Sequence, residues 1–141
     1  MAIDDAGELI VLAPALKEFG EDKEIDRLIR KYGYFGTPAT LKACDENVEL
    51  RNNLSAAAHL IHGSSEGRFS ITYCPGKGPE NLTQQEIESV GFRYADIDEI
   101  SAKYDTGNLR DGFNTTAEGE EIFYISNPAL GLWAFKDRFE Y

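Results

Sequence analysis

Apolar and polar residues follow two different periods along this chain, and segments of the two periods alternate. Short runs rich in Ile, Val and aromatic residues predict strands, whereas apolar residues that recur every three or four positions predict amphipathic helices. The expected strands are residues 7–14, 68–74, 92–94 and 121–126. We therefore expect an α/β fold, with a mostly parallel sheet of about four strands and helices on both faces in a Rossmann-like three-layer arrangement.

The first two helices carry their own start and stop signals. Asp22 is a favourable N-cap for a helix over residues 22–32, and Gly33 supplies the left-handed residue that commonly follows a helix. Thr37 is expected to cap a short second helix, which opens with Pro38 at its first position.

A third helix is expected over residues 47–63, with Asn47 as its cap. Its expected inner side consists of Leu50, Leu54, Ala57, Ala58 and Ile61. Thr83 and Glu86 have capping-box spacing and predict a later helix. The polar, glycine-containing residues 105–119 are expected to form a long loop.

The composition fits one globular domain and argues against several classes of protein. The chain has 141 residues, 42% of them hydrophobic, and a formal net charge of -11. Such acidity repels phosphate backbones, so we expect no nucleic-acid partner. No apolar run approaches the ~20 residues of a membrane-spanning helix, so we expect no membrane partner. The acidic start is unlike a secretory signal, and Cys44 and Cys74 are two thiols, which together favour a cytoplasmic protein without a disulfide.

The two histidines of the chain, His59 and His62, lie three residues apart near the end of the expected 47–63 helix. That spacing places them on one helix face. Three interpretations are open: packing and capping of the helix end, a pair that binds substrate, or two ligands of a metal ion. Neither an HExxH nor a CxxC motif accompanies them, which weakens the metal interpretation.

Polar residues flank the histidines on both sides. Ser64 and Ser65 lie in a Gly-Ser-Ser-Glu-Gly turn, which is either a simple helix-to-strand connection or an amide-lined site for a carboxylate. Arg51 and Asn52 either form an exposed helix end or hold a carboxylate through hydrogen bonds. The candidate substrate-binding residues are Arg51, Asn52, His59, His62, Ser64 and Ser65. No catalytic residue and no metal ligand is assigned.

Four segments of the chain together resemble one known family: residues 7–14, 21–34, 53–73 and 120–133. They are similar to the C-terminal domain of the nickel-pincer-dependent lactate racemase family, and more closely to its homologues that act on other hydroxy acids. The runs AHLIHGSSEGRF, which begins at Ala58, and IFYISNPALGLW, which begins at Ile122, carry the most specific likeness.

The resemblance implies an enzyme of two α/β domains with its active site in the cleft between them. In that family the N-terminal domain supplies the acid–base histidines, the lysine linked to the nickel-pincer nucleotide, and the histidine that ligates nickel. None of those motifs occurs in this chain. Residues 1–141 are therefore expected to form a single α/β domain, the C-terminal domain of a longer enzyme. The expected partners are that missing N-terminal domain and a small 2-hydroxy acid.

The resemblance also implies the chemistry: racemisation or epimerisation of a 2-hydroxy acid by hydride transfer to and from a cofactor that the missing domain mainly binds. This chain would close on the substrate and be inactive alone. The family's lactate racemases carry a tryptophan near the position of Asn52, and the polar residue here favours a larger or more hydroxylated acid than lactate. The alternative function is a stand-alone domain that binds or senses a small carboxylate at the Ser64–Ser65 turn.

Overall fold

The computed structural model describes residues 3–130, which group into two compact units, residues 3–97 and residues from 98 onward. The elements in chain order are β1 (Glu8–Ala13), α1 (Lys23–Tyr32), α2 (Thr37–Glu46), α3 (Val48–Arg51), α4 (Leu54–His62), β2 (Ser70–Pro75), α5 (Gln84–Ser89), β3 (Arg93–Tyr94), α6 (Ile97–Tyr104), β4 (Gly112–Thr115), β5 (Glu121–Tyr124) and the short 3-10 helix η1 (Pro128–Leu130). The predicted α/β class is confirmed.

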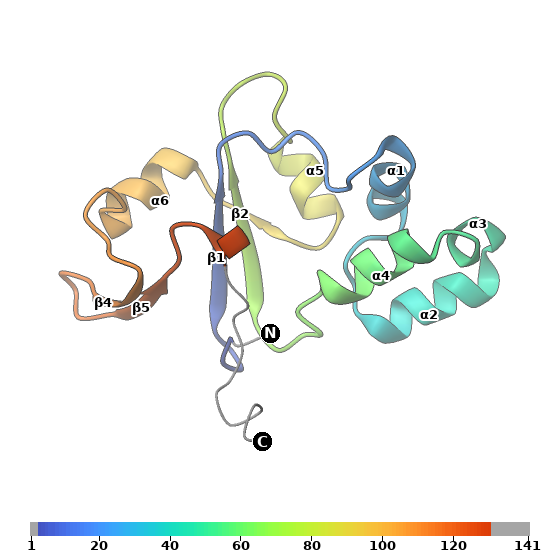
Figure 1. Ribbon diagram of the computed structural model, residues 1–141, viewed down its shortest axis with the longest axis horizontal. Coiled ribbons are helices and arrows are strands. Elements are labelled where there is room, and N and C mark those ends of the chain that lie inside the picture. The colour runs from blue at the N-terminus through green and yellow to red at the C-terminus, as the bar shows by residue number, and fades with distance from the viewer. Residues whose placement is uncertain (1–2, 131–141) are drawn as a thin grey trace. The chain divides into compact units, whose positions relative to one another are not determined.

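The sheet of the first unit has three parallel strands in the order β1-β2-β3. Because this order follows the chain, both crossovers run in the same direction across the sheet, and the right-handed rule places their helices on one face. Figure 1 shows α1 to α5 together on one side of β1 and β2. The further helix layer expected on the opposite face stays a prediction.

The prediction of a four-stranded sheet is wrong in its count. The fourth expected strand, residues 121–126, forms β5, which pairs antiparallel with β4 in a separate two-stranded sheet. Residues 105–119 were expected to be a loop, yet they contain β4. The hairpin turn is closed by backbone hydrogen bonds between Thr116 and Glu120 (2.8 Å) and between Gly119 and Thr116 (3.0 Å). Side-chain alternation predicts the strand state but does not identify the strand's partner.

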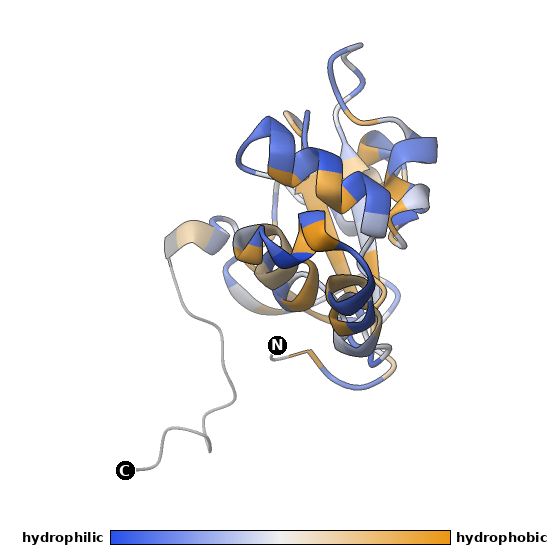
Figure 2. Cartoon of the chain, turned by 90° about the vertical axis from the view of Figure 1, so that its right-hand side faces the viewer, coloured by the Kyte–Doolittle hydropathy of each residue, from blue (hydrophilic) through white to orange (hydrophobic). Residues whose placement is uncertain are grey.

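One hydrophobic core joins the helices of the first unit to its sheet. Leu28 of α1, Leu60 of α4 and Ile87 of α5 are fully buried, and Ile71 of β2 packs in the same cluster. Figure 2 shows hydrophobic colour on the inward turns of these helices and hydrophilic colour on their outward turns. This is the amphipathic pattern that the sequence periodicity predicts.

The expected 47–63 helix is in fact two helices, because the chain turns at Asn52 and Asn53. The Asn53 side chain accepts a hydrogen bond from the Ala56 N–H at 3.0 Å and starts α4 afresh. The new start changes the inner face: Ala56, Ala57 and Leu60 are buried, whereas the predicted Leu54 is 73% exposed. Asn47 precedes α3 without a side-chain capping bond, since its amide donates to the Ala43 carbonyl instead.

The ends of α1 and the start of α5 follow the sequence signals closely. Asp22 accepts hydrogen bonds from the N–H groups of Glu24 and Ile25, which confirms it as the cap of α1. Gly33 has a positive φ of 67° after that helix. At α5 the capping box of Thr83 and Glu86 is present in both directions. These local motifs were predictable because they involve residues within one helical turn.

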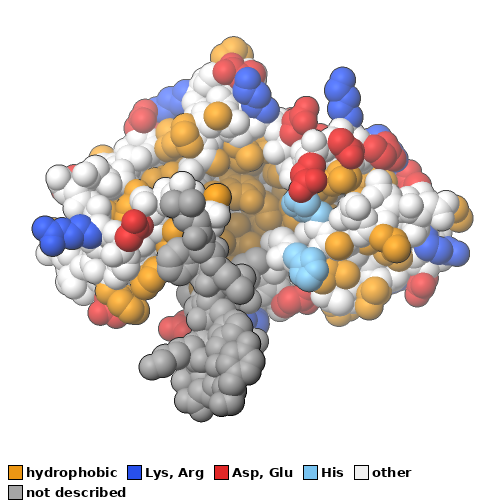
Figure 3. All heavy atoms as spheres, in the orientation of Figure 1, with side chains coloured by type: hydrophobic (Ala, Val, Ile, Leu, Met, Phe, Trp, Pro, Cys, Tyr) orange, Lys and Arg blue, Asp and Glu red, His pale blue; other side chains and the backbone are white. Residues whose placement is uncertain are grey.

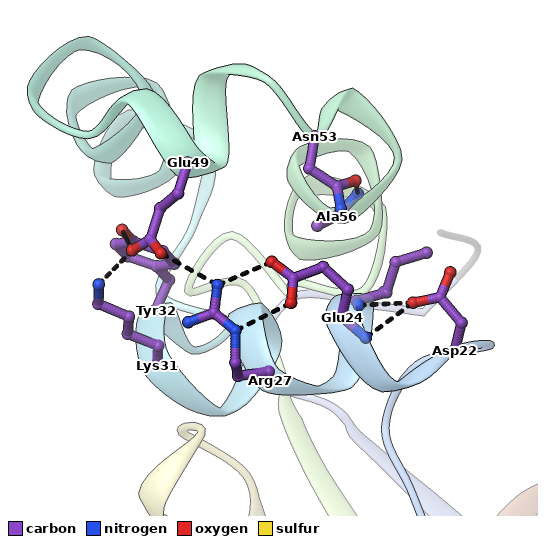
Figure 4. A network of polar contacts seen from close by, with 9 residues as sticks. Asp22, Glu24, Arg27, Lys31, Tyr32, Glu49, Asn53 and Ala56 are labelled. Carbon is purple, nitrogen blue, oxygen red and sulfur yellow. Dashed lines mark hydrogen bonds and ion pairs between the residues drawn. The ribbon is translucent and has the colours of Figure 1, made fainter.

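Charged side chains tie α1 to the short helix α3 on the outside of the core. The Glu49 carboxylate accepts hydrogen bonds from Arg27 (3.0 Å), from Lys31, and from the Tyr32 hydroxyl (2.6 Å), as Figure 4 shows. Lys31, then Tyr32 and Arg27, lower the pKa of Glu49 to about 2. The carboxylate is therefore ionised throughout the neutral range, and α3 is held against α1 by charge as well as by packing.

Two further sequence expectations concern the thiols and the membrane. Cys44 and Cys74 are both free thiols, and burial raises the pKa of Cys74 to about 11. A thiol with so high a pKa stays protonated and unreactive at neutral pH. Across residues 3–130, no helix combines the length and apolar character that a membrane crossing requires.

Candidate functional site

The two histidines lie on the last turn of α4, the helix whose residues Ala56, Ala57 and Leu60 are buried in the core. His59 is partly buried and His62 is exposed. Figure 3 shows both histidine side chains on the same face of the molecule. The helix therefore presents the pair at the surface, and the interpretation that both are packed in the core is excluded.

A buried tyrosine holds the ring of His59. The Tyr34 hydroxyl lies 3.0 Å from Nδ1 of His59, and the two ring centroids are 5.9 Å apart. Burial raises the pKa of Tyr34 well above its ordinary value, so the phenol keeps its proton at neutral pH. With Nδ1 engaged by Tyr34, Nε2 is the ring nitrogen left for a ligand.

The position of Tyr34 is itself set by tight packing. Its ring stacks on Phe92 at 4.5 Å, and Phe92 meets Tyr73 of β2 edge-on at 4.8 Å. A Cβ at Gly63 would lie 2.5 Å from the Tyr34 ring, so the helix end approaches the tyrosine as closely as only glycine allows. His59 is thus supported by an aromatic group anchored in the sheet.

Arg51 and Asn52 lie at the other end of α4 from the histidines. The Arg51 guanidinium donates to the carbonyls of Cys44 (3.0 Å) and Asp45 (2.7 Å), which caps the end of α2. Asn52 is the exposed C-cap residue of α3. Asn52 precedes α4, and at 1.5 Å per residue the five steps from Leu54 to His59 span roughly 7.5 Å along the helix axis. Arg51 and Asn52 thus lie beyond the start of α4, and the histidines lie on its last turn.

Ser64 and Ser65 form the turn that follows α4. Ser64 is buried, and its hydroxyl accepts a hydrogen bond from the Glu66 N–H at 3.0 Å. The Ser65 carbonyl accepts from the Arg68 N–H at 3.0 Å. Ser64 is thus used within the turn, whereas the partly buried Ser65 lines a hollow beside β2 and β3.

Glu66 has a structural role that the sequence did not reveal. Its carboxylate accepts hydrogen bonds from the Thr37 N–H (2.9 Å) and the Thr37 hydroxyl (2.6 Å), so it caps α2. The prediction that Thr37 is the N-cap is wrong, because Gly36 occupies that position and Thr37 is the first helical residue. Glu66 has an unusual positive φ of 53°. No local motif could signal a cap supplied from 29 residues away.

Among residues 3–130, no group of three His, Cys, Asp or Glu side chains is arranged to hold a metal ion. The His59–His62 pair alone is an incomplete ligand set. We derive no step through a nickel-pincer nucleotide for this chain.

Comparison with solved structures supports the fold. The chain is similar to a crystal structure of a structural genomics target from Thermotoga maritima, with a TM-score of 0.55 and 21% identity over 68% of this chain and 24% of that chain. This chain thus spans about a quarter of that protein's length. At this identity the likeness concerns the α/β fold alone. No protein-family model and no curated protein matches the chain.

Proposed function

We propose that this chain is the substrate-closing C-terminal domain of a 2-hydroxy acid racemase or epimerase whose nickel-pincer cofactor is bound mainly by another domain. The observation that carries the proposal is the His59–His62 pair, presented at the surface by α4 with the His59 ring fixed by Tyr34 at 3.0 Å. The α/β fold and the sequence resemblance of residues 53–73 support the same assignment.

The role that the geometry suits is recognition of the substrate. A histidine whose ring orientation is fixed donates or accepts one well-directed hydrogen bond at Nε2, which is what a hydroxyl or carboxylate of a small acid requires. His62, one turn further along α4, adds a second polar ring on the same face. The partner domain would supply the reacting groups, and closure would exclude water.

The alternative of a carboxylate bound in the Ser64–Ser65 turn itself has less support. The Ser64 hydroxyl is buried and accepts a hydrogen bond from the Glu66 N–H within the turn. A hydroxyl buried in this way is hard for a carboxylate in solvent to reach.

The test is an assay of the natural full-length protein in its cofactor-loaded form. A panel of single-enantiomer 2-hydroxy acids would be incubated with that protein and with the 141-residue chain, and the products separated on a chiral column. We expect interconversion by the full-length protein, none by the chain alone, and a loss of about tenfold or more in kcat/KM for His59→Gln.

The control for that assay is Lys42→Gln, a change at an exposed side chain of α2, which should leave the rate unaltered. Racemisation by the isolated chain would overturn the proposal. Full activity of His59→Gln would show that His59 is not part of the site, and the His59–His62 pair would then no longer support the proposal.

A further inference from the structure

Two adjoining hollows lie at the N-terminal ends of β2 and β3, within the unit formed by residues 3–97. The larger has a volume of about 330 Å³ and the smaller about 80 Å³. Phe69, Ser70 and Arg93 line both of them. A combined space of this size accommodates a small organic molecule.

Arg93 is the uncompensated charge of this region. The other arginine lining the larger hollow, Arg68, is neutralised by Asp5 at 2.6 Å and also donates to the Ile3 carbonyl at 3.0 Å. Within residues 3–130, no carboxylate or carbonyl pairs with the exposed Arg93 guanidinium. The chain has a net charge of -11, so acidic side chains that could pair with an arginine are abundant. An arginine that remains unpaired beside a hollow therefore points to an anion from outside the chain.

Polar and aromatic groups complete the lining. The hydroxyl-bearing residues Ser65 and Ser70 lie beside Arg93 along the smaller hollow. Its apolar part includes Tyr34 and Phe92, which are stacked at 4.5 Å, together with Phe69 and Ile71. A few polar groups set against an apolar surface is the usual composition of a small-molecule site.

We infer that this is a binding site for a small organic monocarboxylate. The planar guanidinium of Arg93 matches a carboxylate through two parallel hydrogen bonds, and the serine hydroxyls can donate further ones. The stacked rings of Tyr34 and Phe92 offer contact to a short apolar group of the same molecule. One uncompensated cation in a strongly acidic chain favours a single negative charge over the double charge of phosphate.

This site is separate from the proposed racemase role, and its assignment does not depend on that role. It nevertheless touches the histidine face through Tyr34, whose ring lines the smaller hollow and whose hydroxyl bonds Nδ1 of His59. A bound carboxylate that contacts the ring should therefore change the environment of the His59 imidazole. The Glu66 carboxylate does not oppose the ligand directly, since it is held by Thr37.

The experiment is an NMR titration of the 15N-labelled chain with sodium propionate, with potassium phosphate in a parallel series at constant ionic strength. We expect saturable shifts of the backbone signals of Ser65, Ser70 and Arg93, with a dissociation constant on the order of 1–10 mM for propionate. Phosphate should bind more weakly than propionate. Tighter binding of phosphate would overturn the assignment to a carboxylate.

Three variants make the test specific. Arg93→Gln should weaken propionate binding by about tenfold or more, and Arg93→Lys should weaken it less because the charge is kept. Arg68→Gln removes the paired arginine of the same hollow and should change the affinity by less than about threefold. Shifts that do not saturate by about 50 mM propionate, or an Arg93→Gln chain that is folded and binds as the wild type does, would overturn the inference.

Discussion

The hydroxyl of Tyr34 and Nδ1 of His59 lie 3.0 Å apart, which joins a buried aromatic group to a histidine at the protein surface. Tyr34 is 8% exposed and His59 is only partly buried, so the bond spans the boundary between core and solvent. It fixes which imidazole nitrogen faces outward. Any function of His59 therefore depends on Tyr34, which orients the imidazole without having to contact a ligand at Nε2 itself.

Tyr34→Phe removes this hydrogen bond and keeps the stacked ring. We expect the free energy of unfolding to fall by about 0.5–1.5 kcal/mol, because the bond is partly shielded from water. Urea denaturation measures that loss. Tyr104→Phe is the control, since the bond of its hydroxyl with Lys103 is exposed to solvent and its loss should cost less. Equal losses in the two variants would contradict a special supporting role for Tyr34.

Glu66→Gln tests the cap that Glu66 supplies to α2 from a distant part of the chain. Losing a charged acceptor for the Thr37 N–H and hydroxyl should cost about 0.5–2 kcal/mol of stability. Glu46→Gln, at the other end of α2, breaks only a 3.9 Å ion pair with Lys42 and should cost less than about 0.5 kcal/mol. If Glu66→Gln is as stable as the wild type in urea, the negative charge of Glu66 contributes nothing to the cap.

Leu60 and Leu54 lie on the same helix, and together they test which face of α4 is buried in the core. Leu60 is fully buried, so Leu60→Ala should destabilise the protein by about 2–5 kcal/mol through lost burial and a cavity. Leu54 is 73% exposed, and Leu54→Ala should change stability by no more than about 0.5 kcal/mol. We expect Leu60→Ala to melt at a lower temperature than Leu54→Ala. If Leu54→Ala melted at the lower temperature instead, the continuous 47–63 helix with Leu54 on its inner side would be the better description.

Stability should fall in acid partly because of Glu86. The Thr83 N–H, the Thr83 hydroxyl and Arg30 lower the pKa of Glu86 to about 2, from an ordinary value of 4.5. A carboxyl with a depressed pKa in the folded state contributes stability that is complete above its unfolded pKa and is lost as the pH falls from 4.5 towards 2. Urea midpoints measured across that range should fall less steeply for Glu86→Gln than for the wild type. Identical pH curves would show that Glu86 contributes nothing to acid denaturation.

The sequence predicts the local parts of this fold better than its long-range parts. The caps at Asp22 and Thr83 and the strands β1 and β2 follow from residues near one another in the chain. The pairing of β5 with β4 instead of with the parallel sheet does not, because the alternation of side chains is the same for any partner.

The candidate site shows the same division. The i, i+3 spacing places His59 and His62 on one face, as predicted, because helix periodicity is a local property. Tyr34, Glu66 and Arg93 were missed, since each acts on residues 25 or more positions away or lines a hollow that only folding creates. Arg51 was chosen for its chemistry, yet its guanidinium serves the carbonyls that end α2.

The central claim is that the face of α4 carrying His59 and His62 binds a small 2-hydroxy acid. The most direct test follows the imidazole signals of both histidines by NMR while an Arg93→Gln chain is titrated with single-enantiomer 2-hydroxy acids, so that the Arg93 site does not contribute. Titration of the same chain with the matching acids that lack the 2-hydroxyl is the control. The account predicts saturable shifts of both imidazoles that are larger with the hydroxyl than without it. Imidazole signals that stay unmoved throughout, or that respond equally to both series, would contradict it.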